Sequence, residues 1–272
     1  MSRTAGTMTT AVDAPRLSAG RLRDARLLVV LVLALAAAAW LWLALAGGHG
    51  QHGGTAGHAH AGALGAAATW LLGWVVMVVA MMLPPALPLL LTVRRLVAGR
   101  PSRSWLLAAC GAAFVAVWAV AGVAFLLGGL LVSGAADRVA WLGQHPHVAS
   151  GVAAIAVGAY QFTPLKNACL TACRSPLGLA MTTWTGARAP AIEAALIGSR
   201  FGLVCVGCCW ALMTLTFTVG TAAMPIMVLA AALMTAERIL PAVRPLVPAI
   251  AACAIALGLL VLLRVLPPGL AA

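Results

Sequence analysis

Long apolar segments are the feature that most constrains this chain. Seven of them can be read from the sequence, and most reach the ~20 residues that an α-helix needs to cross a bilayer. Their approximate bounds are 27–46, 69–91, 105–132, 148–163, 199–221, 225–240 and 246–264. Hydrophobic residues make up 63% of the chain, far more than a soluble domain can bury. The sequence therefore predicts an all-α, polytopic transmembrane helix bundle, because helices satisfy their backbone groups within each segment.

The first apolar segment also resembles a signal peptide. Arg21, Arg23 and Arg26 precede it, and Ala44-Leu45-Ala46 resembles a cleavage site. Its apolar run of about 20 residues is longer than the roughly 7–15 of a signal-peptide core, which favours an uncleaved anchor. We expect about seven spans, or six if the first is cleaved.

Basic residues predict the orientation in the membrane. With the N-terminus inside, only Arg138 and Arg264 of the 17 lysines and arginines fall on the outer side. This bias accounts for the net charge of +12, so the lipid bilayer is expected as a partner and nucleic acid is not. We predict a multi-pass protein of the bacterial inner (cytoplasmic) membrane.

The predicted topology divides the chain into five parts. They are a basic inner tail (1–26), a first span or signal anchor (27–46), an outer loop rich in histidine and glycine (47–68), a core membrane domain (69–240), and a last span with the C-terminal tail (241–272).

Three thiols lie close together in the fifth apolar segment, which reads Cys205-Val-Gly-Cys208-Cys209-Trp-Ala-Leu-Met213. On a helix these three cysteines and Met213 fall within an arc of about 140°. A shared face of thiols and a thioether is what a soft metal ion requires. The alternative is structural, because small residues such as Gly202 and Gly207 allow helices to pack closely. The sequence leaves both interpretations open.

Methionines and prolines mark the second apolar segment as a partner for these thiols. Met77 and Met81 are four residues apart and share a helix face, and Met82 is a weaker candidate. Thioethers suit copper(I), although methionine is also a good gap filler in a core. The run Pro84-Pro85-Ala-Leu-Pro88 withholds backbone donors and predicts a kink or break in the helix.

A second pair of thiols follows the fourth apolar segment, in what we expect to be an inner loop. Cys169 and Cys173 are four residues apart, so on a helical turn both would face the same way. This spacing could hold a metal ion or form a reversible disulfide. We expect the flanking Lys166 and Arg174 to favour the thiolate form, which binds metal.

Three of these motifs occur together in a known pattern. They are Met81-Met82-Leu-Pro84, then Tyr160-Gln-Phe-Thr-Pro-Leu-Lys166 through Cys169, Cys173 and Arg174-Ser-Pro176, and then Gly202 through Cys205 and Gly207-Cys208-Cys209-Trp-Ala-Leu-Met213. In this combination the chain resembles an uncharacterised bacterial family of predicted metal-binding integral membrane proteins. The resemblance covers roughly residues 70–240. It implies metal binding at these same cysteines.

The predicted topology separates histidines from cysteines. All six histidines fall outside, and His49, His52, His58 and His60 share the flexible glycine-rich loop. They are weaker candidates for a metal-collecting site, and a solvated linker is the alternative. All seven cysteines fall in the inner half. This asymmetry fits a metal path, but it also fits avoidance of an oxidising exterior.

Other residues have simpler interpretations. Gly198 and Gly202 form a small-residue pair that predicts tight helix contact. Arg238 ends the sixth segment, and we expect its side chain to extend to the membrane interface as an anchor. Glu193 could be a hard ligand or a proton acceptor, although no pattern singles it out.

We therefore expect a protein that handles a soft transition metal in transport, storage or delivery, with copper(I) favoured and zinc or no metal left open. Its partners would be a metal chaperone or another membrane subunit. The chain contains no GxxxxGK[ST] nucleotide motif and only five carboxylates, so we do not expect an enzyme. The alternatives are a membrane thiol redox or electron-transfer protein, and an assembly subunit with structural cysteines.

Overall fold

The computed structural model describes residues 19–47, 62–139, 141, 144–218, 223–240 and 246–263, and every regular element in these ranges is helical. In chain order the elements are α1 (Ala19–Gly47), α2 (Ala63–Met82), the 3₁₀ turn η2 (Pro84–Ala86), α3 (Leu87–Leu96), α4 (Arg103–Arg138), α6 (Pro146–Tyr160), α7 (Pro164–Arg174), α8 (Pro176–Thr183), α9 (Pro190–Thr218), α10 (Ala223–Ile239) and α11 (Leu246–Leu262). The described part of the chain thus has the predicted all-α class.

Four helices are long and apolar enough to cross a membrane. These stretches are Leu22–Leu45 in α1, Leu64–Met82 in α2, Arg103–Ala135 in α4 and Pro190–Thr214 in α9. The pair α6 and α7, bent by 61°, adds a fifth if it forms one broken span. Helices α10 and α11 have 17 residues each. The count of seven spans therefore stays a prediction.

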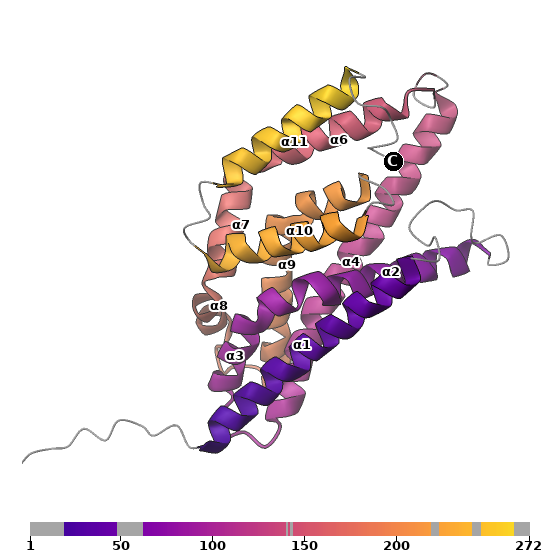
Figure 1. Cartoon of the computed structure of the whole chain (residues 1–272). Coiled ribbons are helices and arrows are strands. Elements are labelled where there is room, and N and C mark those ends of the chain that lie inside the picture. Colours follow the sequence, from indigo (N-terminus) through magenta and orange to yellow (C-terminus); the bar gives the residue numbers. More distant parts are fainter. Residues whose placement is uncertain are drawn as a thin grey trace, which may run out of the picture.

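Helix α9 lies at the centre of the contacts and is packed against α4, α6, α7, α8 and α10 (Figure 1). A Cβ added at Gly198 would collide with the backbone carbonyl of Cys110 in α4, and one at Gly202 would lie 3.0 Å from the Val117 side chain. The predicted tight contact of this glycine pair is confirmed. It brings α9 against α4 over the turns that precede the cysteines.

The proline run breaks the helix as predicted. Helix α2 ends at Met82, and Pro84 and Pro85 form a single 3₁₀ turn before α3 begins. A proline has no N–H to donate to the preceding turn, so the α-helical ladder cannot continue through this run. The break places Met82, which is fully buried, at the end of a helix.

The segment after α6 is a helix and not the loop expected there, whereas its inner position stays a prediction. Helix α6 ends at Tyr160, and α7 begins at Pro164 after a sharp bend. Thr163 caps α7, because its hydroxyl accepts a hydrogen bond from the Lys166 backbone N–H at 3.3 Å. Proline suits the first turn, where its missing donor has no helical partner. This start signal stands in the sequence and places Cys169 and Cys173 on a helix.

Candidate metal centre

The cysteines of α9 form one buried face of that helix. Cys205, Cys208 and Cys209 are each at most 3% exposed. The Sγ of Cys208 lies 3.3 Å from the Sγ of Cys209 and 3.2 Å from the carbonyl oxygen of Cys205. The shared face expected from the helical spacing is confirmed.

Helix α7 brings a fourth thiol to this face. The Sγ of Cys173 lies 3.6 Å from the Sγ of Cys208, and Cys173 is also buried. Cys169, one turn earlier, is half-buried and packs where a side chain on Gly207 would otherwise lie. The hydroxyl of Tyr160 donates to the carbonyl of Gly207. Gly207 thus allows α7 and the end of α6 to approach the cysteine face of α9.

The guanidinium of Arg238 in α10 sits among these sulfur atoms. Its Nη2 lies 2.8 Å from the Sγ of Cys205, 2.8 Å from that of Cys209 and 3.5 Å from that of Cys208. The side chain of Arg238 is 7% exposed. The interpretation of Arg238 as an interfacial anchor is therefore wrong, because its charged group points into the protein.

Helix α2 contributes a thioether through Met82. Its Sδ lies 3.7 Å from the same Nη2 of Arg238. Met77 is buried in the core, and Met81 lines a cavity beside α10. The methionine that reaches Arg238 is thus the weaker of the sequence candidates. We call Met82, Cys173, Cys205, Cys208 and Cys209 the sulfur cluster.

A buried ion pair lies beside the sulfur cluster and joins α7 to α10. The Nζ of Lys166 is 3.1 Å from Oε2 of Glu237 and also donates to the side-chain oxygen of Gln161. The Nε of Arg174 donates to the backbone carbonyl of Glu237 at 2.9 Å. Both cations contact Glu237, the residue that precedes Arg238. The expected effect of Lys166 and Arg174 on the thiols stays a prediction.

The remaining sulfur candidates lie in other surroundings. Met213 is buried on α9, one turn beyond Cys209. Cys110 is buried where α4 meets α9, and Cys253 is exposed on α11. Neither of these two cysteines belongs to the sulfur cluster.

The histidine-rich loop lies outside the described residues, so His49, His52, His58 and His60 stay predictions. His145 and His147 are described, with ring centroids 5.5 Å apart. The Nδ1 of His145 lies 2.7 Å from the carbonyl oxygen of Trp141.

Glu193 has a structural role. Its carboxylate accepts hydrogen bonds from the Thr185 hydroxyl at 2.9 Å and from the backbone N–H groups of Gly186 and Arg188. It therefore orders the loop that leads into α9.

The sulfur cluster has the donor chemistry of a soft-metal site. Four thiols and one thioether from α2, α7 and α9 suit copper(I), and the buried position excludes most water. Within the described ranges, no three His, Cys, Asp or Glu side chains are grouped as a metal ion would need them. Nη2 of Arg238 lies between the sulfur atoms in the present arrangement, so a metal ion and this nitrogen cannot share the position.

Arg238 is the residue of this site that sequence reasoning missed. A signal was available, because an ionisable residue within an apolar segment generally faces the protein interior and a partner. The position of Arg238 at the end of the segment favoured an interfacial anchor instead. Which side chains Arg238 meets depends on the packing of α10 against α9, which spacing along one segment does not give.

Comparison with known proteins supports a copper-related function. A family model described as PpoB2, copper chaperone, matches residues 71–261. This match covers more than half of the chain, which therefore belongs to that family. It includes every residue of the sulfur cluster and leaves out the first predicted span and the histidine-rich loop. No curated protein and no solved structure matches the chain.

Proposed function

We propose that this member of the PpoB2 copper chaperone family is a membrane-embedded carrier that holds copper(I) in the sulfur cluster and delivers it to a partner. The observation that carries the proposal is the meeting of four buried thiols and one buried thioether, supplied by three helices. Single cysteines are common in apolar cores, but several thiols in mutual contact are typical of soft-metal sites.

The chemistry of the donors favours copper(I) over harder cations. Thiolate and thioether sulfur select copper(I), whereas magnesium and calcium require oxygen ligands. The nearest carboxylate along α10 is that of Glu237, and it is already paired with Lys166 at 3.1 Å. Copper(I) therefore fits the available side chains without drawing on that ion pair.

The thiol contacts supply a route for transfer. Cys208 contacts both Cys209 on its own helix and Cys173 on α7. Copper(I) held by Cys205 and Cys209 could exchange onto Cys208 and Cys173, with sulfur bound at every stage. Cys169, half-buried one turn before Cys173, would then be the last ligand before a metal chaperone or another membrane subunit.

The location we propose is the bacterial inner membrane. Four described helices, and a fifth if α6 and α7 form one span, are long and apolar enough to cross a bilayer. The bias of basic residues supports an inner position for the end of α7, where Arg174 lies.

Copper titration of the purified full-length chain tests this function. We expect the wild type to bind about one copper(I) per chain in competition with a copper(I) chelator, and Cys205→Ala/Cys208→Ala/Cys209→Ala to bind none, because the α9 thiols supply most of the donors. The matched control is Cys253→Ala, which removes an exposed thiol on α11 and should bind as the wild type does. Equal copper content in the wild type and the triple variant would contradict the proposal.

The contact between Cys173 and Cys208 favours a second candidate, a thiol redox protein. Their Sγ atoms lie 3.6 Å apart on different helices, so a small movement would allow a disulfide. An external oxidant would take up the two electrons, and two protons would be released. Thiol trapping on metal-free protein separates the candidates, because a reversible Cys173–Cys208 disulfide is required only by the redox protein.

A further inference from the structure

A nitrogen of Arg238 lies where a soft cation would be expected. Nη2 is in contact with four sulfur atoms. They belong to Cys205 and Cys209 at 2.8 Å, Cys208 at 3.5 Å and Met82 at 3.7 Å. Arginine cannot lose its proton in a protein, so this nitrogen always carries part of a positive charge. The sulfur cluster therefore already surrounds a cation.

The other two nitrogen atoms of the guanidinium lack hydrogen-bond acceptors. Nε and Nη1 are buried and have no hydrogen-bond partner among the described residues. Asp24 pairs with Arg103 and Glu237 with Lys166, and among the described residues no carboxylate pairs with Arg238. A buried cation with unpaired donors is unfavourable. Within the described part of the chain, the hydrogen bonds of the Arg238 head group all go to sulfur.

We propose that Arg238 is a resident cation that copper(I) displaces from the sulfur cluster, so that this arginine sets how tightly and how long the metal is held. The proposal rests on the function proposed above. A metal ion that enters between the same sulfur atoms must move Nη2 away, since the two cations repel each other and require the same donors. Return of the arginine assists release of the metal to a partner.

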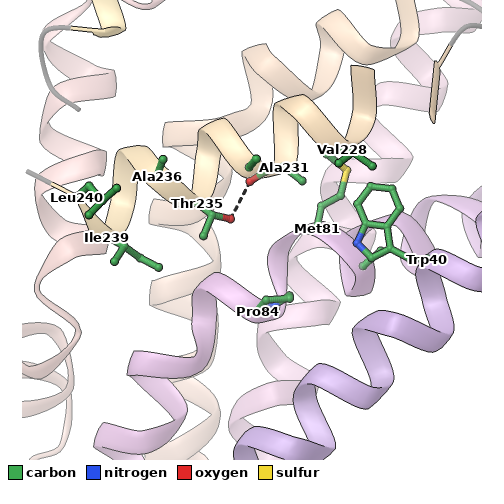
Figure 2. A pocket seen from close by; sticks show the side chains of 11 residues that line it. Trp40, Met81, Pro84, Val228, Ala231, Thr235, Ala236, Ile239 and Leu240 are labelled. Atoms are coloured by element: carbon green, nitrogen blue, oxygen red, sulfur yellow. Dashed lines mark hydrogen bonds between the residues drawn. The ribbon is translucent and has the colours of Figure 1, made fainter. Parts of the chain in front are cut away.

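The surroundings of α10 allow this movement. Arg238 lies in the last turn of α10, where a cation is stabilised by the free carbonyl groups of the helix end. Beside Arg238, α10 also borders an open apolar pocket of about 660 Å³ (Figure 2). Thr235, Ile239 and Leu240 line this pocket opposite Trp40 and Met81. Because this part of α10 borders open space, we expect its last turn to shift when Arg238 withdraws.

Copper(I) affinity of full-length variants in detergent tests the competition. We expect Arg238→Leu, which removes the cation and adds no ligand, to bind copper(I) at least about tenfold more tightly and to release it more slowly, because no charge-assisted contacts with sulfur must be broken. Arg238→Lys keeps a cation and should stay closer to the wild type. The control is Arg103→Leu, which removes an arginine that pairs with Asp24 away from the sulfur cluster, and its affinity should stay within about twofold.

Chemical modification tests the displacement itself. In the metal-free protein we expect Arg238 to be protected from phenylglyoxal by burial, as judged by mass spectrometry of its peptide. Loading with silver(I), a stable monovalent substitute for copper(I), should expose it to reaction. The same addition to Cys205→Ala/Cys208→Ala/Cys209→Ala should not change the pattern of modification.

Three results would overturn the inference while leaving the copper function intact. They are weaker copper(I) binding by Arg238→Leu, unchanged binding by Arg238→Leu, and continued protection of Arg238 in silver-loaded protein. The first would mean that Arg238 stabilises the thiolate ligands of the bound metal. The other two would mean that Arg238 does not compete with the metal. Loss of the copper function is distinguishable, because the wild type would then bind no copper(I).

Discussion

Two buried cations on neighbouring helices have opposite surroundings. Lys166 is paired with Glu237 at 3.1 Å and also donates to Gln161. Among the described residues, the hydrogen bonds of Arg238 go only to sulfur, and its Nε and Nη1 have no hydrogen-bond partner. A fully paired charge fixes a structure, whereas an incompletely paired charge stays available for exchange. We therefore expect Lys166 to hold α7 to α10, and Arg238 to take part in the proposed exchange with copper(I).

The largest expected effect on the free energy of unfolding comes from removing one partner of the Lys166–Glu237 ion pair. Lys166→Met leaves the carboxylate of Glu237 buried without its cation and should lower the free energy of unfolding by about 3–5 kcal/mol. Thermal unfolding in detergent, followed by tryptophan fluorescence, measures this change. Lys166→Met/Glu237→Leu should regain most of the loss, because no charge is left unpaired. If the single variant were as stable as the wild type, the two cations would not differ as described.

A smaller effect is expected at the amide that supports Lys166. Gln161→Leu removes an acceptor from the buried ammonium but leaves Glu237 in place, and we expect a loss of about 1–3 kcal/mol in unfolding free energy. The same thermal measurement applies. A loss greater than that of Lys166→Met would assign the stabilisation to the amide and not to the ion pair.

The smallest effect on stability is expected at Arg238. Arg238→Leu loses the sulfur contacts but also removes a buried charge and two unpaired donors, so the change in unfolding free energy should stay within about 1 kcal/mol. The variant should change copper(I) affinity far more than stability. A loss of about 3 kcal/mol or more would show that Arg238, like Lys166, chiefly holds the fold together.

Helical spacing predicted one part of the site well. The common face of Cys205, Cys208 and Cys209, the break at Pro84 and the tight contact at Gly198 depend on neighbours in sequence, and each is confirmed. Cys169 and Cys173 lie on a helix and not in the expected loop, because Thr163 and Pro164 form a helix start.

The sequence by itself determined the helical class, the breaks in the helices and which thiols share a helix face, since these follow from composition and from a fixed helical period. Only the tertiary structure decided which faces meet. Cys173 joins Cys208, Met82 takes the place expected for Met77 or Met81, and Arg238 turns inward to the sulfur atoms. These contacts join residues up to 156 positions apart, and they depend on how α7 and α10 pack on α9 and on where α2 ends in the fold. A periodicity within one segment carries no information about that packing.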